Sequence, residues 1–420
     1  MKSSLRVSAA LRASAVNGAA NEIETDMFSS RIHWDLRPNR LSEVLEQRRR
    51  SGAKILDLTE SNPTLAGLAY AADEILPALS DMRSLFYHPA PRGLEQSREA
   101  VCGYYASRGV AVEPGRVLLT TSTSESYAQL FKLLADPGDE VLVPRPSYPL
   151  FEFLATLESV RIVHYRLAYD GQWHIDFDSI TRALTSRTRA IILVNPNNPT
   201  GSFLKTDELE RLIALANERR IAIISDEVFA DYALAPDPAR VASIAGLDSA
   251  LTFALSGLSK IAGLPQMKLG WIVIGGPAGL RAQATERLEL IADTYLSVST
   301  PIQLAFPKLL AAGKAVQQQI GARVRLNLEF LRGAFGKESA CGVLETEGGW
   351  YAILRVPRTR SEEEWTLELL SQDNVLVQPG FFYDFESEAF LVLSLLAPPE
   401  PFSEGVRRLA VRVEAVCEAL

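Results

Sequence analysis

The chain of 420 residues contains few of the residues that build metal centres and disulfide frameworks. It has three cysteines and four histidines, and none of them stands at the spacing of a zinc or redox motif. Cys102, Cys341 and Cys417 are scattered along the chain, which fits a reducing compartment. We therefore expect a cytoplasmic protein that holds no metal.

Long apolar runs and blocks of like charge are also missing. No run of about 18 apolar residues occurs, which argues against a membrane-spanning helix. The net charge is -8 without a basic block, so we expect neither nucleic acid nor a membrane as a partner. Residues 1–34 are interpreted as a tail. A transit peptide is the alternative, because the first 21 residues lack acids and are rich in Ala, Ser and Arg.

What is present is enough apolar sequence for two domains, since hydrophobic residues make up 47% of the chain. From residue 116, short apolar runs alternate with helical patterns, and runs without polar alternation indicate strands buried on both faces. This predicts an α/β fold whose mostly parallel mixed sheet is wrapped by helices. The expected strands cover residues 116–120, 140–144, 161–165, 190–194, 221–226, 251–256 and 271–274.

Both chain ends contribute to a second, smaller region. A long helical pattern follows Pro301, and a final helix is expected from Ser403. Strand-like runs between them cover residues 343–345, 350–355, 375–377 and 389–395. We predict a smaller α+β domain from residues 35–75 and 301–420, and a large domain from residues 76–300.

Polar motifs directly follow several expected strands, where ligands bind in parallel sheets. Lys260 lies beside small residues on a loop between two strands, and a desolvated lysine is a candidate for Schiff-base chemistry. Asp226 ends another strand, where a buried carboxylate needs a cation such as a pyridinium nitrogen. Each residue also has a plain structural interpretation, because most lysines solvate a surface and an aspartate can cap a loop.

Three further motifs stand at strand ends. The hydroxyl-rich segment 120–126 opens a helix and suits a phosphate, although an ordinary N-cap explains it equally well. The loop 195–201 places its asparagines among two prolines and a glycine, so a rigid turn aims their amides. Tyr148 stands between prolines and can stack on a flat cofactor, or it is a core tyrosine in a turn.

In their order along the chain, the segment 195–201, Asp226, Ser259-Lys260 and the run 268–271 resemble the fold-type I, class I and II aminotransferases, which depend on pyridoxal 5'-phosphate. The segments 87–93 and 136–140 fit the same pattern. The resemblance covers about residues 35–410 and rests on several independent motifs in register.

The resemblance implies a cofactor site, residue by residue. Lys260 forms the Schiff base with pyridoxal 5'-phosphate and moves the proton, and Asp226 pairs with the pyridine nitrogen. Asn198 bonds the ring oxygen and Tyr148 stacks on the ring. The phosphate is held by four residues of the same chain: Ser122, Thr123, Ser259 and Lys268. Tyr87 reaches the phosphate from the neighbouring subunit, so the resemblance also implies a homodimer with shared active sites.

Three residues depart from the family pattern. The family usually has arginine at Lys268, and lysine keeps the charge but loses the bidentate fork. It usually has tyrosine at Phe229. Its arginine for the substrate carboxylate should fall in the strand 390–394, where we align it with Val392. The substrate pocket has further candidates, each with an equally good packing interpretation: Trp34, Ser61, Arg92, Trp350 and Tyr351.

These motifs favour a pyridoxal-phosphate aminotransferase that moves an amino group from an amine or amino-acid donor to an oxo acceptor. A second hypothesis keeps the cofactor but makes the enzyme a C–S lyase, decarboxylase or racemase, because losing the arginine alters which substrate bond breaks. A third is a non-catalytic ligand-sensing module. That module would need a fused DNA-binding domain or a partner segment. Residues 1–34 are too short for a helix-turn-helix domain, and the retention of Lys260 also argues against this hypothesis.

Overall fold

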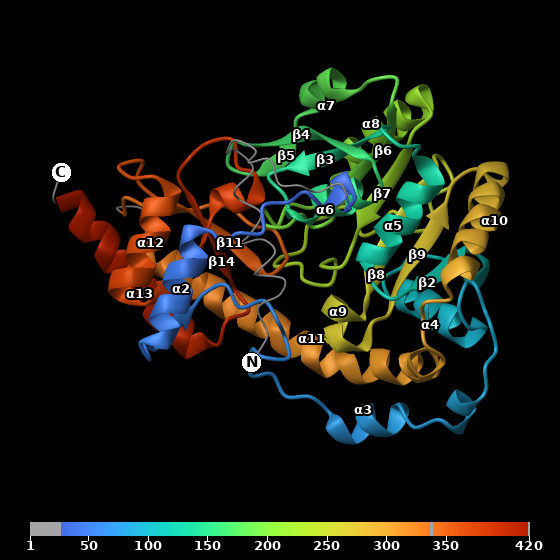
Figure 1. Cartoon of the computed structure of the whole chain (residues 1–420), viewed down its shortest axis with the longest axis horizontal. Helices are drawn as coiled ribbons and strands as arrows, with labels where there is room; N and C mark the ends of the chain where they lie inside the picture. The colour runs from blue at the N-terminus through green and yellow to red at the C-terminus, as the bar shows by residue number, and fades with distance from the viewer. Residues whose placement is uncertain (1–26, 337–338, 419–420) are drawn as a thin grey trace.

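The computed structural model describes residues 27–336 and 339–418, and an eight-stranded sheet forms its centre (Figure 1). The strands are β2 (Val117–Thr120), β3 (Glu140–Arg145), β4 (Arg161–Tyr169), β5 (Trp173–Ile175), β6 (Thr188–Val194), β7 (Ala222–Asp226), β8 (Thr252–Gly257) and β9 (Gly270–Gly275). Their order is β2-β9-β8-β7-β6-β3-β4-β5. The neighbours from β8 to β4 are parallel, whereas β9 is antiparallel to β2 and β8, and β5 is antiparallel to β4.

Helices cover both faces of this sheet, which explains why its strands are apolar without alternation. Leu118 and Ile272 belong to one core, together with α5 (Thr123–Leu134), α6 (Leu150–Leu157) and α10 (Ala278–Tyr295). Their neighbours Leu119 and Trp271 belong to the other core, together with α4 (Glu95–Ala106), α8 (Thr206–Arg219) and α11 (Thr300–Ala334). All seven predicted strands are confirmed, and the short edge strand β5 was not predicted.

The two chain ends meet in a second group of strands and helices. β1 (Leu56–Asp57) pairs in parallel with β12 (Val375–Leu376). A separate antiparallel sheet has the order β10 (Gly342–Val343), β11 (Tyr351–Arg355), β14 (Phe390–Ser394), β13 (Gln378–Pro379). Around them pack α2 (Arg40–Arg50), α12 (Glu362–Asp373) and α13 (Pro399–Glu418). Helix α13 begins before the predicted Ser403, because proline is tolerated in the first turn of a helix.

Helix α11 is 35 residues long and contacts α4 and α9 of the large sheet region as well as α13 (Figure 1). The remaining helices are short: η1 (Ser30–Ile32), α3 (Ala72–Ala78), η2 (Met82–Leu85), η3 (Pro114–Arg116), α7 (Phe177–Ala183), α9 (Leu258–Ile261), η4 (Pro265–Met267) and η5 (Gly380–Tyr383). This architecture confirms the predicted α/β fold class with a smaller α+β part. The residue limits given above for the two domains stay a prediction.

The predicted tail, residues 1–34, falls largely outside the described residues. The part that is described ends near α6, where Arg31 donates to the carbonyl of Leu157 at 3.0 Å. No helix among the described residues is long and apolar enough to cross a bilayer.

Candidate active site

The predicted motifs gather at one edge of the large sheet. Strands β2, β3, β6, β7 and β8 all run in the same direction, so their carboxyl ends lie together. The residues that end or follow these strands include Ser122, Tyr148, Asn198, Asp226 and Lys260. A single edge of the sheet therefore presents hydroxyl, aromatic, amide, carboxylate and amine groups.

Asp226 ends β7, and two hydrogen bonds to its carboxylate are described. It accepts from the backbone N–H of Val228 at 3.1 Å and from the Tyr127 hydroxyl at 3.4 Å. Burial raises the pKa of Asp226 to about 6, and the hydrogen bonds and the positive charge of Lys260 oppose that rise. A carboxylate that burial disfavours this strongly is a good partner for a cation.

Lys260 lies in the one-turn helix α9 directly after β8. Its Nζ is 4.6 Å from the centre of the Trp350 ring and 5.3 Å from that of Phe229. The Tyr232 hydroxyl donates to the backbone carbonyl of Lys260 at 2.6 Å. Both the backbone and the side chain of this lysine are therefore held in place by aromatic residues from other segments.

The structure separates the three asparagines of the 195–201 loop by their contacts. The Asn195 amide bonds Val241 and Leu204, and the Asn197 amide donates to the carbonyl of Pro146. Asn198 differs, because its buried Oδ1 has no hydrogen-bond partner among the described residues. A buried polar atom of this kind costs free energy unless a ligand satisfies it, so Asn198 is the asparagine available for a ligand.

Gly201 closes this loop in a conformation that favours glycine. Its φ is +71°, and a Cβ there would collide with Thr346 and with the Gly348 carbonyl. The loop is therefore packed tightly against the segment that leads into β11, the segment that also carries Trp350.

The hydroxyl-rich segment behaves partly as an ordinary helix cap. Ser122 is the N-cap of α5 and accepts from the backbone N–H of Glu125 at 3.2 Å. Thr123 is the first residue of that helix, whose N-terminus favours an anion. Lys268 follows η4 with a φ of +53° and an exposed side chain, two residues before Gly270. A Cβ on Gly270 would lie 3.2 Å from the Ser122 carbonyl carbon, so this turn approaches the start of α5 closely.

A tyrosine cluster lies next to these groups. Tyr351 lies 6.3 Å from the Phe229 ring and 6.4 Å from the Tyr383 ring, measured between centroids. Burial raises the pKa of Tyr351, and the nearby Tyr148 and Glu60 raise it further. The hydrogen bond between Tyr351 and the Ser61 side chain lowers this pKa in part. Ser61, Tyr148 and Tyr351 therefore belong to one neighbourhood, as expected for residues of a common pocket.

Val392 is fully buried in β14, opposite Ile353 of β11 and Gln378 of β13. Tyr351 pairs with Ser394, two residues further along, so Val392 and Tyr351 lie on the same face of this sheet. The position aligned with the carboxylate-binding arginine therefore faces the side of the tyrosine cluster, but it carries an aliphatic side chain.

Three predicted residues lie elsewhere in the described chain. Arg92 donates to the carbonyl of Gly115 and pairs with Glu289 at 3.2 Å, beside an open hollow of about 620 Å³. These contacts do not support Arg92 as a substrate ligand. Tyr87 is 73% exposed, and Trp34 packs edge-on against Phe153 of α6 with ring centres 4.9 Å apart.

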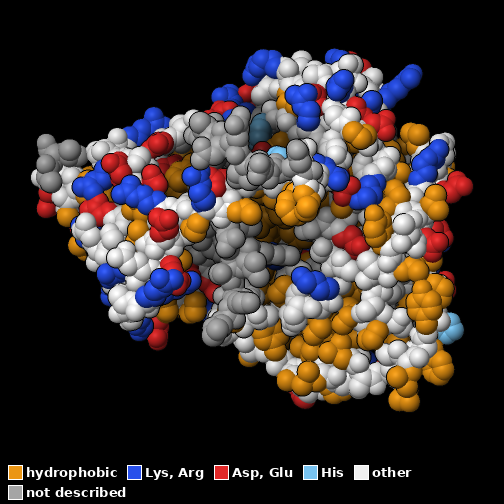
Figure 2. Space-filling model, viewed as in Figure 1, with side chains coloured by type: hydrophobic (Ala, Val, Ile, Leu, Met, Phe, Trp, Pro, Cys, Tyr) orange, Lys and Arg blue, Asp and Glu red, His pale blue; other side chains and the backbone are white. Residues whose placement is uncertain are grey.

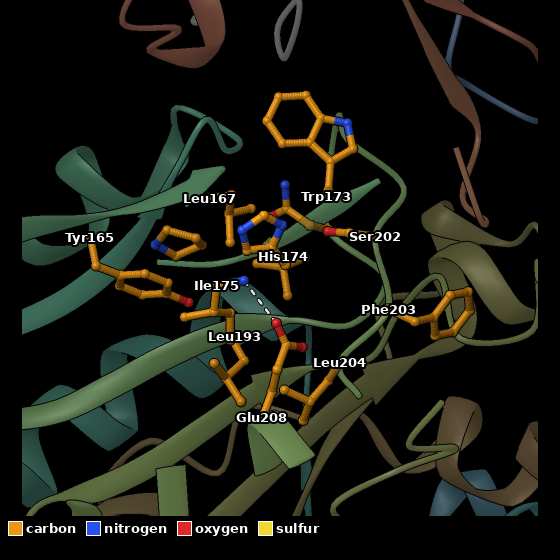
Figure 3. A pocket seen from close by; sticks show the side chains of 13 residues that line it. Tyr165, Leu167, Trp173, His174, Ile175, Leu193, Ser202, Phe203, Leu204 and Glu208 are labelled. Atoms are coloured by element: carbon orange, nitrogen blue, oxygen red, sulfur yellow. Dashed lines mark hydrogen bonds between the residues drawn. The ribbon is translucent and has the colours of Figure 1, made fainter. Parts of the chain in front are cut away.

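A small cavity beside the 195–201 loop is distinct from this group (Figure 3). Its volume is about 30 Å³, which is room for about one water molecule. Glu208 of α8 accepts from the Ile175 backbone N–H at 2.8 Å, and burial raises the pKa of this glutamate. The cavity is thus a packing feature where Glu208 ties β5 to α8.

Three tyrosines of the site were not predicted. Tyr127 reaches Asp226 from α5, Tyr232 reaches Lys260 from the segment after β7, and Tyr383 joins the cluster from η5. Tyr127 carries the clearest signal, because it lies one turn of helix before the apolar Leu130 and Phe131 and is buried with them. The sequence offers no comparable signal for Tyr232 or Tyr383.

The residues present fit pyridoxal 5'-phosphate. Asp226 offers a carboxylate in need of a cation, and Asn198 has a buried polar atom without a protein partner. Lys260 supplies a primary amine, and the start of α5 with Lys268 supplies a positive environment for a phosphate. Each chemical part of the cofactor therefore finds a matching group at this edge of the sheet.

Comparison with known proteins agrees with this geometry. The glutamate-pyruvate aminotransferase AlaA of Escherichia coli is 30% identical over 374 residues, which cover 86% of this chain and 91% of that protein. AlaA of Haemophilus influenzae is 28% identical over 367 residues, or 86% of this chain and 90% of that protein. A solved aminotransferase from Escherichia coli superposes with a TM-score of 0.80 at 26% identity, covering 94% of this chain and 99% of that chain.

The sequence profile of "Aminotransferase class I and II" matches residues 53–400. The match takes in every strand of the large sheet together with β11 and β14 of the smaller one. The chain therefore belongs to the class I and II aminotransferase family.

Proposed function

We propose that Lys260 is the residue through which this aminotransferase moves an amino group from an amine or amino-acid donor to an oxo acid. The observation that carries the proposal is the position of Lys260 Nζ, which lies against two aromatic rings and close enough to Asp226 to influence its charge. A lysine in water-poor surroundings with a carboxylate nearby is suited to attach a carbonyl group and to transfer a proton.

Pyridoxal 5'-phosphate is the cofactor of the family to which the chain belongs. When bound, its pyridinium ring withdraws electrons from the substrate carbon that carries the amino group. We assign Asp226 to the ring nitrogen, Asn198 to the ring oxygen and Tyr148 to the ring face. The phosphate is assigned to the groups around the start of α5 and α9, namely Ser122, Thr123, Ser259 and Lys268.

Lys260 would act as the base and acid at the substrate carbon, with Nζ taking the proton and returning it. The Tyr232 hydroxyl, which donates to the Lys260 carbonyl, fixes the backbone from which this side chain extends. The alternative outcomes of a lyase, a decarboxylase or a racemase lack support from the comparisons, since the named relatives are aminotransferases.

The donor is expected to be an amine, or an amino acid whose carboxylate binds weakly. The relatives are named for glutamate, pyruvate and alanine, all of which carry an α-carboxylate. Val392 offers no charge to such a group, and a guanidinium there would add charge-assisted hydrogen bonds worth about 1.5 to 3 kcal/mol each. The aliphatic residue therefore favours donors without a carboxylate at this point.

A matched pair of donors tests this expectation. L-Norvaline and 1-aminobutane differ only in the carboxylate, and we expect a higher kcat/KM for 1-aminobutane, measured from the oxo product. Val392→Arg should raise kcat/KM for norvaline, alanine or glutamate about tenfold or more, because one charge-assisted bond is worth about that factor. High efficiency with an ordinary α-amino acid in the parent would show that Val392 is wrongly assigned, and a loss of that efficiency in Arg92→Ala would show that Arg92 binds the carboxylate despite its pairing with Glu289. If no donor yields an oxo product, the proposed function itself fails.

We also propose a homodimer in the cytoplasm. Large apolar side chains are exposed in and after α3, and Figure 2 shows them gathered on that side of the molecule: Leu76, Met82, Leu85, Phe86 and Tyr87. A surface of this kind favours a protein partner, and Tyr87 lies within it, as a residue shared with a neighbouring site would. Sedimentation equilibrium should give twice the mass of the chain.

The proposed cytoplasmic location has a separate basis. The three free thiols of the described residues suit a reducing compartment.

A further inference from the structure

The amine of Lys260 lies against two buried aromatic faces. Trp350 is fully buried and Phe229 is 4% exposed, and their rings meet edge-on with centres 5.2 Å apart. A cation within about 6 Å of a ring centre is attracted by the ring quadrupole, most strongly by indole, and the attraction grows where water is excluded. Both distances from Nζ, 4.6 Å to Trp350 and 5.3 Å to Phe229, fall within that range.

Trp350 is itself held rigidly in this position. The Tyr232 ring packs edge-on against it with centres 5.1 Å apart, and the Tyr232 hydroxyl donates to the Lys260 carbonyl. The backbone N–H of Leu395 donates to the Trp350 carbonyl at 2.7 Å, which ties the residue to the end of β14. The indole ring and the lysine backbone are therefore fixed relative to one another through a single tyrosine.

The indole N–H takes no part in this arrangement. It is buried, and Nε1 has no hydrogen-bond partner in the described part of the chain. A buried donor without a partner destabilises the fold, so a phenylalanine or leucine would serve better if Trp350 only filled space. What tryptophan adds over those residues is the larger, more electron-rich face that Lys260 contacts.

We propose that Trp350 is a positioning residue for Lys260. Its indole face holds the ammonium form of Lys260 near Asp226 whenever Nζ is not bonded to the cofactor, and Tyr232 fixes the lysine backbone while it does so. This goes beyond a lining role for Trp350, and it rests on the proposed role of Lys260.

The test uses the cofactor-free protein, so that its readout is independent of turnover. Reductive methylation of Lys260 is followed against pH by peptide mass spectrometry in the parent, Trp350→Phe and Trp350→Leu. Losing the indole face removes an attraction for the ammonium form, so the midpoint pH of Lys260 labelling should fall by about 0.5 to 1 unit in the Leu variant. The Phe variant should show a smaller fall, because benzene has the weaker quadrupole.

Two controls keep the experiment decisive. Lys132, which pairs with Glu158 at 2.6 Å, is labelled in the same samples and should keep its midpoint. Trp350→Phe removes an unpaired donor and retains a ring, so it should fold even if the cavity left in the Leu variant prevents folding. A midpoint in Trp350→Phe that is unchanged or higher than in the parent would overturn the proposal.

Tyr232→Phe separates the ring from the backbone bond. It retains the ring against Trp350 but loses the bond to the Lys260 carbonyl, so the midpoint should stay unchanged while kcat falls about 2- to 10-fold. A midpoint shift in this variant as large as that of Trp350→Leu would also overturn the proposal. Failure of the proposed function would show differently, as cofactor attachment that survives Lys260→Ala.

Discussion

Replacing Lys260 with alanine should abolish covalent attachment of the cofactor and proton transfer at the substrate carbon together. General acid–base catalysis by a positioned group contributes about 10²- to 10⁴-fold, and loss of the attaching amine adds to that, so we expect turnover to fall by at least about 10⁴-fold. The purified parent should be yellow, because a pyridine ring conjugated to a lysine imine absorbs visible light. The variant should lose this band, as measured by absorbance of protein reconstituted with pyridoxal 5'-phosphate.

Lys132→Ala serves as the matched control for a lost lysine. Lys132 lies on α5, pairs with Glu158 and lies 5.9 Å from the centre of the Tyr295 ring, and neither of these partners is an assigned site residue. It should keep the visible band and the parent turnover. Transamination at the parent rate in Lys260→Ala would show that another amine carries the reaction.

Much of this site follows from the sequence because parallel strands bring their carboxyl ends to one edge. Once the strands before Asp226, Lys260 and the 195–201 loop are identified, their proximity is fixed by topology. The order of strands in the sheet does not follow in the same way. β9 enters antiparallel between β2 and β8, and β5 is only three residues long, so neither has a distinctive pattern.

The contacts that hold Lys260 could not be predicted, because they come from distant parts of the chain, even though Trp350 was named as a candidate for the substrate pocket. Trp350 reaches Lys260 across 90 residues of sequence, and nothing in the run 348–351 distinguishes a ring that contacts an amine from one that fills a core. Arg92 shows the same limit from the other side, since it was a candidate for the pocket, and its guanidinium pairs with Glu289, a contact that the local sequence does not indicate. Side-chain direction in loops depends on tertiary contacts that local sequence does not specify.

Asp226 makes the cofactor-free protein less stable as the pH rises. Burial raises its pKa from 3.8 to about 6, so the folded protein keeps this proton at pH values where the unfolded chain has lost it. The stability from that proton is complete below about pH 4 and is lost as the pH rises through about 6. A shift of about 2 units corresponds to about 3 kcal/mol. Cofactor-free Asp226→Asn should therefore exceed the parent in unfolding free energy by up to that amount at pH 8, and by less at pH 5, measured by urea denaturation.

The same Asp226→Asn change should reduce turnover per bound cofactor by about 10²- to 10³-fold, the usual effect of removing one preorganised electrostatic partner. An amide cannot keep the ring nitrogen protonated, so the substrate carbon loses its electron sink while the phosphate contacts remain. Glu227→Gln is the matched control. Glu227 is adjacent and buried, and burial raises its pKa to about 7, but its carboxylate accepts from Ser243 and Ile244, away from Lys260. Glu227→Gln should therefore keep turnover within a few-fold of the parent. Loss of bound cofactor in Asp226→Asn at unchanged turnover per bound cofactor would assign Asp226 to binding rather than to the reaction.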